Sequence, residues 1–143
     1  MNKTVSIHAK LNEHFLIQTD IRGHHLSIDQ PQSAGGQDEG VSPLEMFLFT
    51  LAGCIGSIAR IMAMQQRLNL RGMSIEVSGD YDPAGLLGKA TDQRMGFQQL
   101  FIQAQLDCDL SPVEQAAFFD QVCARCPVHD NIQYSTAISH NLQ

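Results

Sequence analysis

The segment from Met46 to Met64 is the longest apolar stretch of the chain and limits what the chain can fold into. It contains Arg60 and several small or polar residues, whereas a bilayer span needs roughly 20 predominantly apolar residues with few charges. The opening residues, Met1–Lys10, lack the apolar region and small-residue cleavage site of a signal peptide. The sequence therefore predicts a helix buried in protein, with no membrane partner and a cytoplasmic location.

Signals for the start of this helix lie directly before the apolar stretch. Ser42 is a favourable N-cap, Pro43 fits the first helical position, and Glu45 completes a capping box, so we expect a helix that runs to about Leu68. A helix that is apolar on nearly every side is a central helix wrapped by other elements. A chain of 143 residues has little material to wrap it. The pattern therefore favours a partner subunit.

The rest of the chain predicts strands and shorter helices. Alternating apolar and polar residues, with Gly23 at a turn, indicate strands at Thr4–Ile7, Phe15–Thr19, His24–Asp29, Met73–Gly79, Gly96–Leu106 and Gln133–Ser139. Turn-forming residues predict loops over Gln30–Ser42 and Asp80–Arg94. Ser111, Pro112 and Glu114 form a second capping box, which predicts a helix to about Ala124 and then a helical turn over Pro127–Ile132. The fold class is therefore α+β.

Composition excludes some classes of function. A length of 143 residues suits one domain over residues 1–143, and 43% apolar residues can form one packed core. The formal net charge is −6, from nine Lys and Arg against fifteen Asp and Glu, and no basic cluster is present. Phosphate contacts supply most of the affinity of a nucleic-acid surface. We therefore expect no nucleic-acid partner.

The four cysteines are the candidate chemical groups, and in a reducing compartment a cysteine is a small core residue, a metal ligand or a reactive thiol. Cys54 lies inside the long helix, where it fits either a buried apolar residue or a reactive thiol. Cys126 precedes Pro127 and fits the N-cap of a short helix, where unpaired N–H groups can lower the pKa of a thiol. Arg125 and His129 could add to that effect. The alternative is that Cys126 fills a gap in the core.

Cys123 and Cys126 also form a C-x-x-C pair. A structural zinc site usually needs four ligands, and the spacing to Cys108 and His129 matches no usual zinc pattern. A thioredoxin-type pair opens a helix, whereas Cys123 falls in the last turn of a predicted one. We therefore predict no metal and no cofactor.

Taken together, the short motifs of this chain resemble the OsmC/Ohr family over essentially its whole length. Their order and spacing carry the resemblance: Asp29-Gln30-Pro31, Gly35-Gly36-Gln37-Asp38, Ser42-Pro43-Leu44-Glu45, Leu51-Ala52-Gly53-Cys54 and Cys126-Pro127-Val128-His129. The resemblance implies an OsmC-like fold, in which antiparallel sheets wrap a long central helix in an intertwined homodimer.

The resemblance also implies a thiol peroxidase active on organic hydroperoxides in oxidative or osmotic stress. By motif position, Cys54 attacks the O–O bond, Cys126 captures the sulfenic acid as a disulfide, and a dithiol reductant restores the pair. Physically, a thiolate is the nucleophile, and a nearby second thiol prevents over-oxidation. In the family an Arg from the N-terminal sheet holds the thiolate, and Arg22 is the candidate here, with Glu45 as the candidate for the family carboxylate.

One departure from the family supports a second hypothesis. The peroxidases carry a carboxylate directly after the proline, whereas this chain has Leu44 there and Glu45 one position later. One residue along a helix is a rotation of about 100°. The alternative is therefore a protein of the same fold without peroxidase activity, which binds a small apolar or thiol-reactive ligand at the dimer interface. Arg60, on the long helix, is an alternative partner for Glu45 or for a neighbouring subunit.

Overall fold

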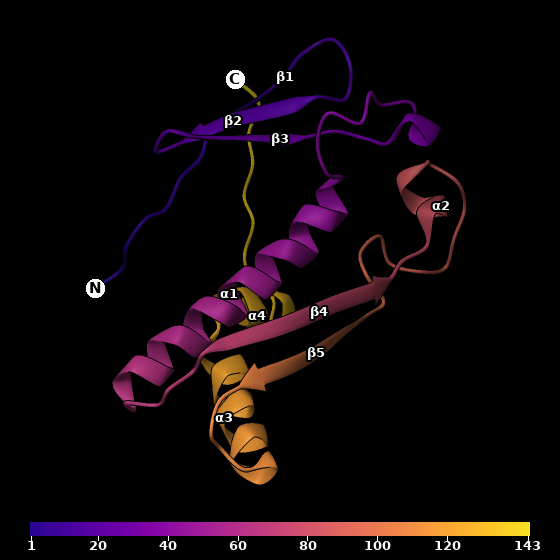
Figure 1. Cartoon of the computed structure of the whole chain (residues 1–143). Coiled ribbons are helices and arrows are strands. Elements are labelled where there is room, and N and C mark those ends of the chain that lie inside the picture. The colour runs from indigo at the N-terminus through magenta and orange to yellow at the C-terminus, as the bar shows by residue number, and fades with distance from the viewer. The chain divides into compact units, whose positions relative to one another are not determined.

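The computed structural model describes residues 1–143 and divides them into two compact units, 1–47 and 48–143. Figure 1 shows the two antiparallel sheets and the helices, which confirm the α+β class. The elements are β1 (Ala9–Leu11), β2 (Ile17–Ile21), β3 (His24–Ile28), η1 (Gln32–Ala34), α1 (Pro43–Gln65), β4 (Gly72–Asp80), α2 (Pro83–Leu86), β5 (Gln99–Asp107), α3 (Pro112–Arg125) and α4 (Pro127–Gln133). One domain over 1–143 stays a prediction.

In the first unit, β1, β2 and β3 form an antiparallel sheet in chain order. Arg22 and Gly23 make the turn between β2 and β3, with φ values of 54° and 84°. Positive φ at both central residues is the geometry that suits the twist of a two-residue hairpin. The predicted turn at Gly23 is therefore confirmed.

The predicted strand at Thr4–Ile7 is wrong, because the first strand is β1 at Ala9–Leu11. Ala9 pairs with Thr19, and extending this register would place Ser6 opposite Arg22. There β2 has already ended in the turn, so the earlier residues have no strand to pair with.

Helix α1 begins as the sequence predicts and ends three residues earlier than expected. The Glu45 N–H donates to the Ser42 hydroxyl at 3.3 Å, and the Ser42 N–H donates to the Glu45 carboxylate at 2.7 Å, which confirms the capping box. At the other end, Arg67 has a φ of 54°, and the Leu68 N–H donates to the Ala63 carbonyl at 2.8 Å. This left-handed residue closes the last turn.

In the second unit, one core joins α1, α3, α4 and the β4–β5 hairpin. The strands are antiparallel, from Gly72 opposite Asp107 to Asp80 opposite Gln99, and their burial alternates. Ser111 and Glu114 form the predicted capping box at the start of α3. The buried core residues are Leu51, Ile55, Ala59, Met62, Ala63, Leu70, Phe118, Val122 and Cys126.

Two predictions for the second unit need correction. The loop predicted over Asp80–Arg94 contains the short helix α2, whose N-cap Asp82 accepts the Ala84 N–H at 2.9 Å. The strand predicted over Gln133–Ser139 is wrong, because Gln133 ends α4 and residues 134–143 are neither helix nor strand. In this unit β4 and β5 pair only with each other, and the last residues do not add a third strand to this sheet.

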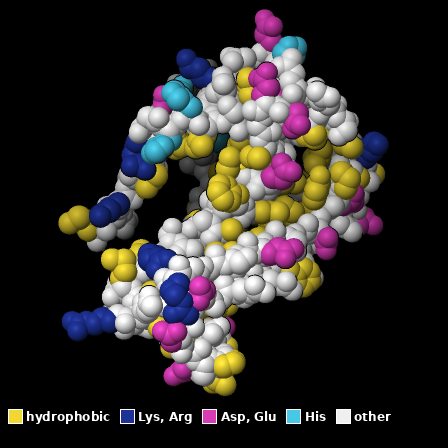
Figure 2. All heavy atoms as spheres, viewed as in Figure 1, with side chains coloured by type: hydrophobic (Ala, Val, Ile, Leu, Met, Phe, Trp, Pro, Cys, Tyr) yellow, Lys and Arg dark blue, Asp and Glu magenta, His cyan; other side chains and the backbone are white.

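Helix α1 has a buried face and an exposed apolar face. By length and composition it could cross a membrane, yet Leu51, Ile55, Ala59, Met62 and Ala63 are buried in the core of the second unit. Phe49, Ile61 and Met64 remain exposed, at 70%, 44% and 72%. Figure 2 shows hydrophobic side chains gathered at the surface above β4, beside the upper end of α1. One chain alone therefore leaves much of the apolar helix uncovered.

Candidate active site

Cys54 lies in the middle of α1, next to the buried face of the helix. Its side chain is half-buried and packs against the core of the second unit. Leu51, three residues earlier, and Ile55, the next residue, belong to that core. The position follows from helical spacing, because residues three or four apart share a face. Cys54 is therefore held by rigid secondary structure while part of it stays open to solvent.

Cys126 lies between the end of α3 and the start of α4. It is only 1% exposed, and its Sγ accepts the His129 N–H at 3.4 Å as the N-cap of α4. Pro127 occupies the first helical position, where no N–H is needed. The N-cap predicted from Cys126-Pro127 is therefore confirmed, and the cap fixes the direction of the side chain.

The structure brings the two predicted cysteines together. Cys54 packs against the core that contains Cys126, its thiol is a neighbour that affects the pKa of Cys126, and both cysteines are free rather than joined in a disulfide. Burial and the neighbouring Cys54 thiol raise the pKa of Cys126 to about 11, although the N–H groups of His129 and Val128 act in the opposite direction. The N–H groups at the cap do lower the pKa of Cys126, but burial outweighs them, so the net pKa is raised and not lowered.

The charged residues proposed to assist the thiol have other positions. Glu45 uses its carboxylate in the capping box of α1 and is exposed. Arg22 is exposed in the β2–β3 turn, and neither residue takes part in an ion pair. Leu44, at the position of the family carboxylate, is half-buried. The catalytic roles of Arg22 and Glu45 stay predictions.

The other arginines considered from the sequence are bound elsewhere. Arg60 donates to the Leu70 carbonyl and forms no bond with Glu45. Arg125 donates to the Gln65 side chain at 3.1 Å, so its charge is held at the end of α1. No charged side chain is among the causes of the pKa shift of Cys126.

The remaining cysteines lie in the same unit. Cys108 is half-buried and packs against the core, and Cys123 is half-buried in the last turn of α3. Burial, and then the charge of Asp120, raise the pKa of the Cys123 thiol. No three His, Cys, Asp or Glu side chains are grouped as metal ligands.

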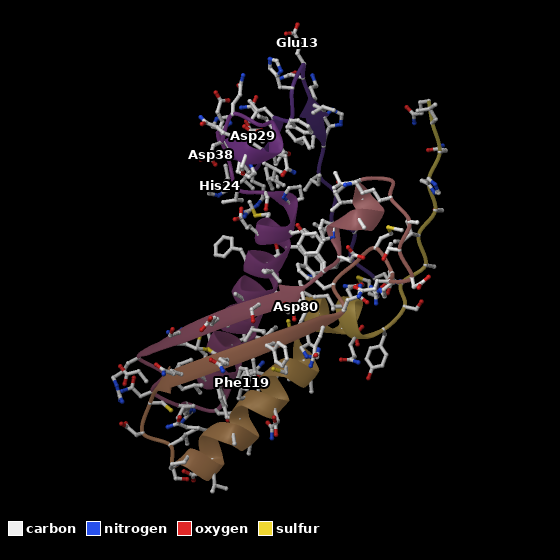
Figure 3. The ribbon with its side chains drawn as sticks, turned by 90° about the vertical axis from the view of Figure 1, so that its right-hand side faces the viewer. Glu13, His24, Asp29, Asp38, Asp80 and Phe119 are labelled. Atoms are coloured by element: carbon white, nitrogen blue, oxygen red, sulfur yellow. The ribbon has the colours of Figure 1, made fainter.

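A buried aspartate organises the loop before α1, and sequence reasoning gave it no role. Asp29 is 1% exposed, and its carboxylate accepts the N–H groups of Gln30 at 2.7 Å, Gln37 at 3.3 Å and Glu39 at 3.0 Å. These bonds, led by that from Glu39, lower the pKa of Asp29. Figure 3 shows Asp29 and Asp38 close together in this loop.

Two glycines allow the loop to close around Asp29. A Cβ atom on Gly36 would lie 2.0 Å from the Gln30 carbonyl oxygen, and one on Gly40 would lie 2.5 Å from the Ser27 carbonyl oxygen. Only glycine fits such close backbone approaches. The sequence signal that could have indicated this loop is an aspartate directly after a strand, followed by Gly36 and Gly40.

Comparison with known families identifies the chain. The family model described as OsmC-like protein matches residues 36–141, which include both cysteines and the helix between them. The chain therefore belongs to the OsmC-like family, as its motifs predicted.

Individual relatives agree with this assignment. The chain is 26% identical over 143 residues to a hydroperoxide reductase of Mycoplasma genitalium, covering 99% of this chain and 96% of the relative. An OsmC-like protein of Mycoplasma pneumoniae superposes with a TM-score of 0.80 at 25% identity, over 94% of this chain and 91% of that one. An organic hydroperoxide resistance protein of Legionella pneumophila has the same fold, with a TM-score of 0.68 at 19% identity over 92% of each chain.

Proposed function

We propose that this protein reduces organic hydroperoxides through a disulfide cycle between Cys54 and Cys126, in defence against oxidative or osmotic stress. The observation that carries the proposal is the contact between a half-exposed thiol on α1 and a buried thiol at the N-cap of α4. The relatives named hydroperoxide reductase support the same activity.

The cycle assigns a different step to each sulfur. The Cys54 thiolate attacks the O–O bond, takes one oxygen as a sulfenic acid, and releases an alkoxide that is protonated to the alcohol. The Cys126 thiol then displaces water from the sulfenic acid and forms the disulfide. A dithiol reductant supplies two electrons and two protons through thiol–disulfide exchange and restores both thiols. The raised pKa of Cys126 keeps this residue a protonated thiol at neutral pH, which suits the resolving step.

Apolar hydroperoxides fit this site better than hydrogen peroxide. Cys54 is flanked on α1 by Leu51, Ile55 and Ile58, which belong to the core or pack against it. Of these residues Ile58 is only half-buried, so it can contact a fatty or aromatic hydroperoxide and give it binding energy that hydrogen peroxide cannot gain. We therefore propose fatty or aromatic hydroperoxides as the substrate class.

A steady-state assay tests the proposed activity. The reduced protein is mixed with a dithiol such as dithiothreitol and either cumene hydroperoxide or hydrogen peroxide, and peroxide loss is followed against a protein-free control. We expect faster consumption of cumene hydroperoxide. Consumption no faster than the control would contradict the proposal.

The second candidate function is ligand binding without peroxidase activity, in the same fold. Leu44 in place of the family carboxylate, and the engagement of Glu45 in the capping box, favour it. A small apolar or thiol-reactive ligand would then bind beside Cys54 at a dimer interface. Two results together would support this candidate. The protein would be inert in the peroxide assay, and a small apolar or thiol-reactive ligand added beforehand would slow the alkylation of Cys54.

We further propose that the protein is a cytoplasmic homodimer whose interface covers the exposed apolar face of α1. Phe49, Ile61 and Met64 lie on that helix and are exposed in the single chain. Large apolar side chains exposed along one side of a helix are typical of an interface. A second copy of the chain would cover the apolar side chains of α1 that one chain leaves exposed.

A charge on this face should weaken the dimer. We expect Phe49→Asp to shift the protein from dimer to monomer, because an aspartate in an apolar interface loses hydration without gaining a partner. Analytical ultracentrifugation over a range of concentrations measures the shift. Val113→Asp is the matched control, since Val113 is 80% exposed on α3, and it should remain dimeric. A Phe49→Asp protein that dimerises like the wild type would exclude this face.

A further inference from the structure

We propose that Cys123 is a reserve partner for Cys126: when reductant is scarce, Cys123 takes over the disulfide from Cys54 and leaves Cys54 free. This inference rests on the proposed function and goes beyond it. It gives a redox role to the C-x-x-C pair, which the cycle between Cys54 and Cys126 does not use.

The end of α3 places Cys123 and Cys126 at a separation that a disulfide can span. The Cys126 N–H donates to the Cys123 carbonyl at 3.3 Å, a bond between residues three apart that tightens the last turn of the helix. In such a turn, the Cα atoms of residues three apart lie about 5 to 6 Å from each other, and their side chains share a face. A disulfide joins Cα atoms roughly 4.4 to 6.8 Å apart. The pair can therefore be bridged without unfolding the junction of α3 and α4.

Cys126 is the thiol that both disulfides would share. It is buried in the core of the second unit, and Cys54 packs against this core from α1. Cys123 precedes Cys126 by one helical turn on α3. Both partners are half-buried and thus more accessible than Cys126. A disulfide can therefore pass from α1 to α3 while the buried sulfur keeps its place.

The exchange needs no outside oxidant or reductant. The Cys123 thiolate attacks the Cys126 Sγ of the first disulfide, the bond to Cys54 breaks, and Cys54 leaves as a thiolate. The proton that Cys123 gave to solvent is replaced by one that Cys54 takes up. Burial, and then the charge of Asp120, raise the pKa of Cys123, so its thiolate is scarce at neutral pH. We therefore expect the exchange to follow the faster formation of the first disulfide.

The exchange restores the reactive thiol before any reductant acts. Cys54 becomes free again and can reduce a further hydroperoxide, while the first oxidation is stored between Cys123 and Cys126. A dithiol reductant later opens this second disulfide by the same chemistry. Excess dithiothreitol reduces the first disulfide before it is exchanged, so the activity in the steady-state assay does not depend on Cys123.

Oxidation by diamide tests the pair without hydroperoxide. The double variant Cys54→Ser, Cys108→Ser keeps only two thiols, and trypsin cleavage after Arg125 places them on different peptides. We expect a loss of about two mass units, with the Cys123 and Cys126 peptides joined, because a disulfide forms from two thiols by loss of two hydrogens. Adding Cys123→Ser leaves one thiol and is the control, which should form no intramolecular disulfide.

A time course tests the exchange itself. The reduced Cys108→Ser protein receives one equivalent of cumene hydroperoxide without reductant, and samples are quenched with acid at intervals and mapped. We expect the Cys126 peptide to be joined first to the Cys54 peptide. The Cys123 peptide should then replace it in about half of the molecules or more, as expected for two disulfides of similar stability.

Two results would overturn the inference. One is a diamide-treated double variant whose two peptides stay separate although circular dichroism shows that it is folded. The other is a linkage between Cys54 and Cys126 that persists unchanged through the time course. A protein that does not react with hydroperoxide would instead contradict the proposed function, and diamide would then replace cumene hydroperoxide as the oxidant in the time course.

Discussion

Replacement of Cys54 by serine is expected to lower hydroperoxide consumption by roughly 10³-fold or more, the scale of loss when an enzyme loses its nucleophile. A hydroxyl on α1 would stay protonated, and its oxygen attacks peroxides far more slowly than a thiolate. Cys54 is half-buried next to the core, so the serine variant should remain folded. The steady-state assay with cumene hydroperoxide and dithiothreitol measures the loss.

Cys126→Ser should give a different result from Cys54→Ser. The first oxidation of Cys54 continues, but no intramolecular disulfide can follow, so excess hydroperoxide drives Cys54 to sulfinic and sulfonic acid. Cys108→Ser and Cys123→Ser serve as matched controls on the other two cysteines and should stay active. Full activity of Cys54→Ser, or loss of activity in Cys123→Ser, would move the chemistry to another thiol.

Asp29→Asn is expected to lower the midpoint of thermal unfolding by several degrees at neutral pH. The carboxylate accepts three backbone N–H groups, and an amide cannot accept all three without placing its own N–H₂ against a donor. Asp38→Asn is the matched control, because Asp38 is an exposed residue of the same loop whose φ of 58° suits asparagine. It should unfold like the wild type.

The effect of Asp29 should depend on pH in a defined direction. The folded protein lowers the pKa of Asp29, so its stabilising contribution is complete above the unfolded value of about 3.9 and is lost as the pH falls through the lower folded value. The difference in midpoint between wild type and Asp29→Asn should therefore be constant from about pH 5 to pH 8 and narrow below about pH 4. A difference that does not change in acid would mean that the charge of Asp29 is not responsible.

The sequence predicted the elements whose signals are local. Ser42 with Glu45, and Ser111 with Glu114, each form the expected capping box, because the bonds join residues three apart. Cys126 before Pro127 likewise predicted the N-cap of α4. The start of β1 was harder to predict from the sequence, because it depends on where β2 ends at the turn of Arg22.

The features that were missed depend on contacts distant in sequence. Asp29 accepts hydrogen bonds from N–H groups up to ten residues away, and the sequence pattern does not indicate which N–H groups these are. The net pKa of Cys126 depends on burial and on Cys54, 72 positions earlier in the chain, so the helix cap alone could not indicate that this pKa is raised. The contact of Cys54 and Cys126 followed from family resemblance rather than from either local pattern.

The most direct measurement treats the fully reduced protein with one equivalent of cumene hydroperoxide and follows it by mass spectrometry with a peptide map. We expect a rapid loss of about two mass units, with the Cys54 and Cys126 peptides joined, because the sulfenic acid condenses with the thiol that it contacts. A protein that stays reduced, or that gains oxygen slowly at scattered methionine and cysteine residues, would contradict the disulfide cycle.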